Sequence, residues 1–441
     1  MMLLFSLGKI VAVIAALLGF LLTTSALGTR LRLHSEIKRK ILHAGLGLST
    51  LFFPLIFSQA WEIGLLSALI IAIMMIIRTR PALRCQAGSS LYGVERSSFG
   101  EVFFVIAVLV LFLVSGRHTV LYVVPLIVLT LSDAAAALVG LRFGKRSFPV
   151  MEGQKSLEGM AAFFGVSLVS IVVGLACLCH MPVAALLLTA FIIAALGTLI
   201  EAVSWRGYDN LLIPLGCYLV LQHDLQLGVM ALAVSAATLV ALTGLALFSH
   251  RVSTLKTHAL LAAMITAWLL GEVGGPQWFM VAVVVFAIHA AAGCLYRDTK
   301  SQSLDAVLCV GGTSLFWLNL SVMTGYRDAF FLYCLSMAIH TQIIVLLRAM
   351  AFFKRRNVRR RWVAMAAMGA GAAIYSIFLM FEGVTPQHLV RVAVAVLCTF
   401  GVGTLTGVKS DRASRGRWIE QGAFALFGSM AGFVVMEGLG L

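Results

Sequence analysis

Apolar segments long enough to cross a bilayer follow one another along the whole chain, separated by short clusters of charge. About 20 apolar residues cover the hydrocarbon core of a membrane. Of the 441 residues, 61% are hydrophobic and only 12% are charged, which lies far outside the range of soluble domains. We therefore predict an all-α, polytopic transmembrane helix bundle of about 14–16 spans. The predicted spans lie near residues 8–27, 41–57, 61–77, 101–115, 118–140, 159–179, 183–201, 209–222, 225–248, 258–271, 277–295, 304–325, 328–348, 362–382, 389–408 and 418–438.

Three of these segments leave a choice of interpretation. Residues 209–222 and 258–271 are shorter than a full crossing, so each is a candidate half-helix. The first segment, 9–27, has the apolar length of a signal peptide. It lacks a strongly basic leading region and runs into further spans, so we interpret it as a membrane helix.

The positive charge follows the alternation of the spans. When residues 28–40 are placed in the cytoplasm, alternate loops hold 29 of the 33 lysines and arginines. Cytoplasmic loops carry such an excess in multi-pass membrane proteins, so the net charge of +15 mainly sets orientation. It also favours anionic lipid at the basic loops. No separate basic domain exists, and we expect no nucleic-acid partner. We expect the bacterial inner or plasma membrane, or the endoplasmic reticulum or plastid membrane of a eukaryote.

Composition divides the chain into three parts. Residues 1–34 form a leading span, 35–224 carry acids and bases together at their loops, and 225–441 are apolar with arginine-rich loops and few acids. The alternation of spans places the polar clusters of 35–224 on one side of the membrane, which predicts a single site at the cytoplasmic face. The eight cysteines show no metal-binding spacing. The role of 225–441 and the oligomeric state are not predicted.

Asp133 is an acid inside an apolar segment, about two helical turns before Gly140. Charged groups at membrane depth are costly and usually mark function. We interpret Asp133 as a metal ligand or as a base for a hydroxyl. Two alternatives are a buried acid paired with an arginine, and a helix contact through the small residues Gly140 and Gly144.

A basic, glycine-rich loop follows, with Arg142, Lys145 and Lys155 before Ser156 at a predicted helix start. Backbone N–H groups and the helix dipole at such a start favour phosphate, although the loop is not a Walker P-loop. Ser156 is equally interpretable as an N-cap alone, and Glu158 as a charge that favours the dipole.

Further acids lie at the ends of two spans. Glu201, Asp209 and Asn210 precede Pro214, and their oxygens suit Mg²⁺. The alternative is a solvated turn. Near the start of the chain, Arg39-Lys40-Ile41-Leu42-His43 offers groups for phosphate contact or proton transfer, or for lipid headgroups.

Together these clusters resemble the CTP-dependent polyprenol kinase family, which contains dolichol, phytol and farnesol kinases and is related to phosphatidate cytidylyltransferases. The resemblance covers roughly residues 35–222. The residues that carry it are Arg39-Lys40-x-x-His43, Arg96-Ser97-Ser98-Phe99-Gly100-Glu101, Asp133-x-x-Ala136 with Gly140 and Phe143-Gly144-Lys145, Lys155-Ser156-Leu157-Glu158-Gly159, and Glu201-Ala202 with Gly207-Tyr208-Asp209-Asn210-x-x-x-Pro214.

The resemblance implies transfer of the CTP γ-phosphate to a membrane isoprenoid alcohol, with Mg²⁺ or another divalent metal. Such chemistry asks mainly for positioning and charge neutralisation. The expected nucleotide-phosphate ligands are Arg142, Lys145, Lys155, Ser156, Arg39, Lys40 and His43. The expected metal ligands are Asp133, Asp209, Asn210 and Glu201, and the expected catalytic acids are Asp133, Glu158 and Asp209.

Two other functions remain open at this point. A cytidylyltransferase would make a CDP-lipid from CTP and a lipid phosphate and would release pyrophosphate instead of CDP. A non-enzymatic lipid-phosphate transporter would use the same basic loops as a headgroup gate, and the long second half favours it.

Overall fold

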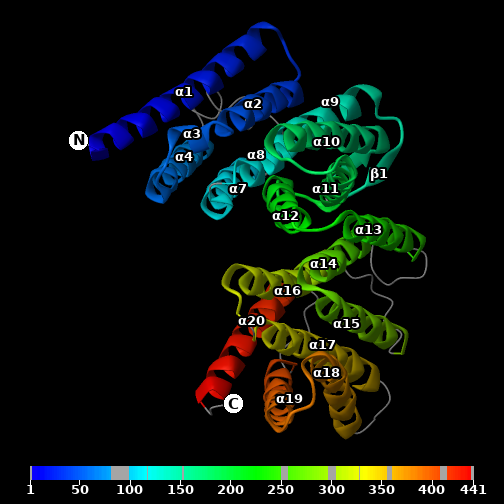
Figure 1. Ribbon diagram of the computed structural model, residues 1–441. Helices are drawn as coiled ribbons and strands as arrows, with labels where there is room; N and C mark the ends of the chain where they lie inside the picture. The colour runs from blue at the N-terminus through cyan, green and yellow to red at the C-terminus, as the bar shows by residue number, and fades with distance from the viewer. Residues whose placement is uncertain are drawn as a thin grey trace. The chain divides into compact units, whose positions relative to one another are not determined.

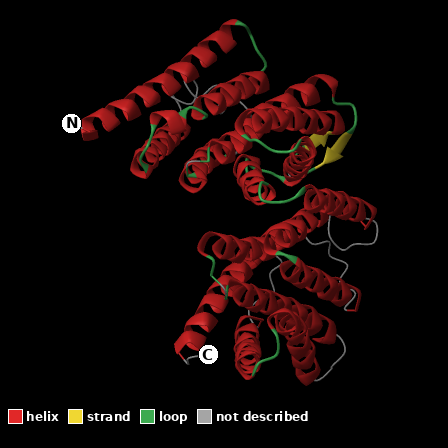
Figure 2. Ribbon diagram, in the orientation of Figure 1, coloured by secondary structure: helices red, strands yellow, loops and turns green. Residues whose placement is uncertain are grey.

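The computed structural model of this protein describes residues 2–80, 99–116, 118–150, 153–249, 257–295, 304–326, 328–354, 360–407 and 415–438. The chain forms two compact units, Met1–Ala237 and Thr238–Leu441. Within the described residues, regular structure is helical apart from one short hairpin (Figures 1 and 2). The predicted all-α, polytopic bundle is confirmed.

Each predicted apolar segment lies on a helix or, for the second and fifth segments, on consecutive helices. The helices of the first unit are α1 (Met2–Arg30), α2 (Ser35–Thr50), α3 (Phe53–Ile56), α4 (Ala60–Thr79), α7 (Gly100–Ser115), α8 (Thr119–Ile127), the π-helix η1 (Val128–Ser132), α9 (Asp133–Phe143), α10 (Leu157–Leu178), α11 (Val183–Val203) and α12 (Asp209–Asp224), with α13 (Val229–Ser249) at the boundary. The second unit contains α14 (Thr257–Gly274), α15 (Pro276–Leu295), α16 (Leu304–Thr324), α17 (Ala329–Lys354), α18 (Arg360–Glu382), α19 (Pro386–Gly407) and α20 (Arg415–Gly438).

The second predicted span is not one helix, and this is a correction. It breaks at Leu51 and Phe52, and α3 restarts with Pro54 in its first turn. A proline is tolerated there because the first helical N–H groups have no partner inside the helix. Because of this break, α2 ends at Thr50 and α3 begins at Phe53.

Nine helices of the described residues are long and apolar enough to cross a membrane, counting α8, η1 and α9 as one span. Three shorter apolar helices, Gly100–Ser115, Pro276–Ala292 and Ala367–Glu382, accompany them. The protein is thus a multi-pass membrane protein. Helix α12 has 16 residues and is shorter than a full crossing, and α14, the other candidate half-helix, meets the criterion with 18.

The span that carries Asp133 contains a wide turn. Pro125 lies inside α8, and the π-helix η1 follows directly and ends at Ser132. Proline removes one backbone donor, and a single π turn re-registers the chain that follows it. Ser132 inside this turn accepts a 2.8 Å hydrogen bond from the hydroxyl of Ser167 on α10. The turn therefore sets the direction in which the side chain of Asp133 projects from the helix.

The basic, glycine-rich loop predicted after α9 contains a small antiparallel hairpin. Strand β1 (Ser147–Pro149) pairs with β2 (Gln154–Ser156), and Phe148 lies opposite Lys155. In the views of the whole chain the hairpin lies at one end of α9, α10 and α11 (Figure 2). Gly153 has φ 94°, a left-handed conformation that glycine adopts without strain.

Helices α9 and α10 approach closely at two glycines. A Cβ added to Gly159 would lie 2.8 Å from the carbonyl oxygen of Ala136 and 3.4 Å from the Cα of Gly140. Only glycine allows backbones this close. Gly140 therefore has the helix-contact role that was one of the alternatives for this segment.

In the second unit, α17 is the central helix. Every residue of its 18-residue apolar window is buried. Its core is aromatic, with Trp278 stacked on Tyr333 at 4.7 Å between ring centroids. A helix that is buried on all sides is expected at the centre of such a bundle.

The glycine contact gives a stability prediction. We expect Gly159→Ala to lower the free energy of unfolding by about 1–3 kcal/mol, because the new methyl meets backbone atoms that cannot rotate away. Gly165→Ala on the same helix is the matched control, since nothing lies within 4 Å of an added Cβ there. The measurement is the melting temperature of the purified protein in detergent. Equal melting temperatures for the two variants would contradict the contact.

Candidate functional site

Three carboxylates from three separate helices meet in the first unit. Asp133 is the first residue of α9, Glu201 lies near the end of α11, and Asp209 is the first residue of α12. One oxygen of each lies within 4.8 Å of the others. Asp133 and Glu201 are buried, and Asp209 is half-buried. Three of the predicted acids thus form one cluster, called the acid cluster below.

The turn between α11 and α12 brings two of these acids back to the same place. Arg206 has φ 54° and Gly207 has φ 86°, so the chain reverses over two left-handed residues. The ring of Tyr208 stacks on Phe103 of α7 with centroids 4.6 Å apart. This packing fixes the start of α12, and with it Asp209.

Helix α2 supplies a cation to Asp133. Lys40 Nζ lies 2.5 Å from Asp133 Oδ1, and the two side chains are only 5% and 7% exposed. His43, one turn further along α2, places Nε2 3.4 Å from Asp133 Oδ2. A buried carboxylate needs such a partner, because an unpaired charge is costly in a low-dielectric environment.

The hairpin supplies a second cation. Lys155 of β2 donates a 2.7 Å hydrogen bond to Glu201 Oε1 and a further hydrogen bond to the Glu201 carbonyl oxygen. Burial disfavours the charged ammonium, but the negative charges of Glu201 and Asp209 outweigh this and raise the pKa of Lys155 above its ordinary value. The lysine is therefore a fixed positive charge beside the acid cluster.

Arg39 is half-buried beside Lys40 and forms a two-point pair with Glu36, at 2.5 Å and 3.1 Å. Burial opposes its charge, but the hydrogen bond to Glu36 and the fields of Asp133 and Asp209 raise the pKa of Arg39 further. The guanidinium of Arg39 thus interacts electrostatically with Asp133 and Asp209, although the described residues show no ion pair between it and the acid cluster.

The acid cluster fits a hard divalent cation. All three donors are carboxylate oxygens, which Mg²⁺ prefers. Glu201 Oε2 and Asn210 Oδ1 are buried and have no hydrogen-bond partner among the described residues. The amide nitrogen of Asn210 donates to the Gly100 carbonyl oxygen at 2.9 Å, which fixes the direction of its free oxygen. A buried oxygen of Glu201 without a partner, inside a cluster of three carboxylates, suits a metal ion.

The other predicted residues lie on or beside the hairpin. Arg142 and Lys145 are exposed. Ser156 caps α10 by accepting a 3.1 Å hydrogen bond from Gly159 N–H, so the N-cap alternative describes its contact. The Glu158 carboxylate accepts from the Arg146 N–H at 3.2 Å. Glu158 therefore holds the hairpin to α10 and is not a member of the acid cluster.

The predicted motif at residues 96–101 contributes a backbone carbonyl group to the site. Gly100 supplies the carbonyl that holds Asn210. Glu101 pairs with Arg78 at 3.2 Å instead of joining the acids, and Arg96, Ser97 and Ser98 lie outside the described residues.

Sequence reasoning missed two features of the site. It listed Lys40 as a phosphate ligand and did not predict the ion pair that Lys40 makes with Asp133. It also missed Phe104, whose ring contacts His43 edge-on at 5.5 Å between centroids. The first had a signal, since an acid inside an apolar segment needs a nearby cation. An apolar residue in an apolar segment carries no such signal.

A protein of known activity resembles this chain. A phytol kinase of Synechocystis sp. is 31% identical over 217 residues, which are 48% of this chain and 89% of that protein. The matched length is close to that of the first unit, Met1–Ala237. No family model and no solved structure matches the chain.

The buried ion pair gives a testable prediction. We expect Lys40→Met to destabilise the protein by about 3–5 kcal/mol, because Asp133 would stay buried without its nearest cation. Combining it with Asp133→Leu should restore most of the loss. Thermal unfolding of both variants in detergent measures the difference, and the exposed Lys145→Met is the control. A double variant no more stable than Lys40→Met would contradict the pairing.

Proposed function

We propose that this chain, which belongs to the polyprenol and phytol kinase-like family, transfers the γ-phosphoryl group of CTP to the hydroxyl of a membrane isoprenoid alcohol. Family membership assigns it to the kinases; the nucleotide, the acceptor and the metal are our proposal. The observation that carries it is the convergence of Asp133, Glu201 and Asp209 from three helices, with Lys40 and Lys155 beside them.

Phosphoryl transfer needs charge neutralisation and in-line positioning more than covalent chemistry by the protein. Asp133, Glu201 and Asp209 would hold Mg²⁺, with the free oxygen of Asn210 as a further ligand. A bound Mg²⁺ would neutralise the β- and γ-phosphate oxygens. Lys40 pairs with Asp133 and Lys155 pairs with Glu201, so positive charge already lies beside the acid cluster before the nucleotide arrives.

His43 is our candidate for the acceptor's proton. Its Nε2 faces Asp133 Oδ2 and has no hydrogen-bond partner among the described residues. The acceptor oxygen would attack the γ-phosphorus, the bond to the β-phosphate oxygen would break, and CDP would leave. The hydroxyl proton would pass to His43, whose imidazolium Asp133 would stabilise.

The turn between α9 and β1 is our candidate for the nucleotide's phosphates. It is flanked by the exposed Arg142 at the end of α9 and contains the exposed Lys145, and Gly144 between them lies against Ser156 at the start of α10. Positive side chains and a helix N-terminus both favour phosphate. By the charge bias of the loops, this face would lie in the cytoplasm.

The acids should be essential for turnover. We expect Asp133→Asn and Asp209→Asn each to lower kcat at least 100-fold, and chelation of divalent metal to abolish activity reversibly. The assay incubates purified protein with γ-labelled CTP, Mg²⁺ and a panel of lipid alcohols, and measures labelled lipid and CDP. Asp328→Asn, in the second unit and paired with Arg391, is the control and should retain activity.

Release of pyrophosphate from CTP and a lipid phosphate would instead identify a cytidylyltransferase. Absence of any nucleotide turnover, with lipid-phosphate transport in vesicles, would identify a transporter.

The two basic residues of the turn between α9 and β1 should act on nucleotide binding alone. We expect the double variant Arg142→Ala, Lys145→Ala to raise the KM for CTP about ten-fold while kcat changes less than three-fold. Both side chains are exposed and lie outside the acid cluster, so their loss removes attraction to phosphate without disturbing the metal ligands. Steady-state kinetics at varied CTP measures the split. A fall in kcat at unchanged KM would contradict this role.

A further inference from the structure

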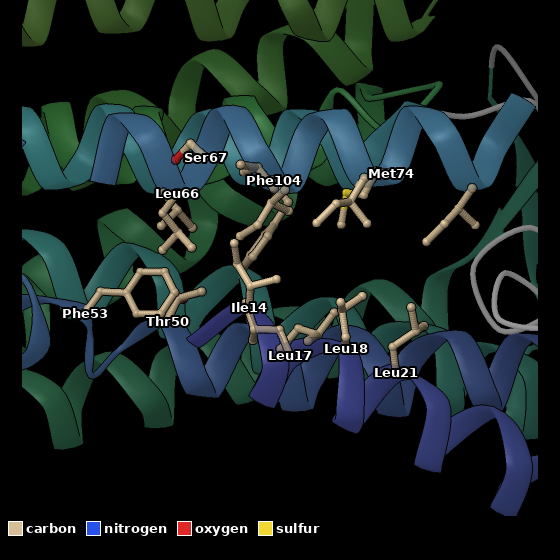
Figure 3. A pocket seen from close by; sticks show the side chains of 16 residues that line it. Ile14, Leu17, Leu18, Leu21, Thr50, Phe53, Leu66, Ser67, Met74 and Phe104 are labelled. Atoms are coloured by element: carbon tan, nitrogen blue, oxygen red, sulfur yellow. The ribbon is translucent and has the colours of Figure 1, made fainter. Parts of the chain in front are cut away.

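An apolar pocket lies between α1, α2, α4 and α7 in the first unit. It has a cavity volume of about 90 Å³ and is open on one side. Side chains of α1 such as Ile14 and Leu18 face Leu66 and Met74 of α4 across it (Figure 3). On α4 its lining extends from Leu66 to Ile77, a length of about 16 Å at the rise of an α-helix. Such a space suits an extended hydrocarbon chain.

One face of α2 connects this pocket to the acid cluster. His43, Leu46 and Thr50 follow at intervals of three and four residues, so they lie on the same side of the helix. Leu46 and Thr50 line the pocket, whereas His43 contacts Asp133. Phe104 of α7 also lines the pocket, and its ring contacts the His43 ring. The apolar pocket therefore lies directly next to His43, which contacts Asp133 of the acid cluster.

The pocket has a closed end away from the acid cluster. Phe53, Leu66 and Val108 line it and belong to the hydrophobic cluster that also contains Tyr122. At the other end Leu21 and Ile77 pack with Leu42, the residue before His43. A lipid alcohol that lies along the pocket would have its hydroxyl group at His43 and the end of its hydrocarbon tail at Phe53.

Helix α1 forms the lipid side of the pocket. Only 17% of its apolar window is buried. Lys9 fastens it to α4 through an ion pair with Glu62 at 2.7 Å, where the Glu62 side chain is fully buried. The lining residues of α1 begin at Ile14, beyond that pair. A lipid can therefore reach the pocket from the bilayer past the poorly buried part of α1.

We propose that this pocket holds the hydrocarbon tail of the lipid alcohol acceptor and that its closed end sets the length of tail accepted; the inference rests on the proposed kinase function. The hydroxyl then lies at His43, beside the acid cluster, and the tail runs along α2 and α4 to Phe53 and Leu66. The pocket is lined by apolar side chains apart from Thr50 and Ser67, so it selects by shape and length rather than by hydrogen bonds.

Ser67 is the position for the test, because it is small, 4% exposed and lies next to Leu66 at the closed end (Figure 3). We expect Ser67→Phe to lower kcat/KM for a four-isoprene alcohol at least ten-fold and to leave that for a two-isoprene alcohol within two-fold. The added ring would shorten the space without touching the acid cluster. Ala68→Phe, one position further on the exposed side of α4, is the matched control and should leave both values unchanged.

Ser67→Ala, which keeps the space open, should behave as the unmodified protein with both alcohols. Equal loss with both alcohols in Ser67→Phe, or no loss with either, would overturn the inference while kinase activity of the unmodified protein still supports the proposed function. Cross-linking of a four-isoprene photoprobe to the folded protein gives a second readout. The probe should label α1 or α4 in the unmodified protein and Ala68→Phe, and labelling should fall at least five-fold in Ser67→Phe.

If the unmodified protein phosphorylates no alcohol, the proposed function fails. Unchanged labelling of Ser67→Phe would overturn the pocket assignment whatever the kinase assay gives.

Discussion

The ion pair between Lys40 and Asp133 is the contact on which the site depends. A carboxylate inside an apolar bundle is tolerated only with a counter-charge at close range, and Lys40 provides it at 2.5 Å from a distant helix. This pair fixes α2 against α9, and Lys155 does the same for the hairpin and α11. Two cations thus hold together acids that would otherwise repel one another, and the polar part of the first unit forms around them. In the proposed function, a divalent ion would bind to the three carboxylates, and the charged nucleotide would bind beside them.

Much of the fold could be predicted because the relevant physics is local. Apolar length determines where helices cross, so each predicted span coincides with a helix or with consecutive helices, and the acids Asp133, Glu201 and Asp209 stand out in apolar surroundings. Other features depend on tertiary packing. The hairpin has only three residues in each strand, too few for a recognisable alternation, and the π turn before Asp133 leaves no pattern that differs from an ordinary helix. Ser156 and Glu158 kept two interpretations in the sequence, because a helix cap and a phosphate ligand use the same residue types.

Head and tail chemistry are separated along one helix. The face of α2 is ionic at Lys40, aromatic and polar at His43, and lines the apolar pocket with Leu46 and Thr50. In the proposed function, this order would place the water-soluble and lipid-soluble substrates on either side of one imidazole, as a reaction between CTP and a membrane alcohol requires. The second unit has its own aromatic core around α17 and contributes no member of the acid cluster in the residues described.

The pairing register of the hairpin has an electrostatic consequence. Phe148 lies opposite Lys155, and successive side chains of a strand point to opposite faces. A slip of one residue in this pairing would turn the Lys155 ammonium away from α11 and leave Glu201 without its counter-ion. The number of residues that connect the two strands therefore determines whether Lys155 pairs with Glu201. An insertion or deletion in this connection would have the same effect on the acid cluster as a substitution of Lys155.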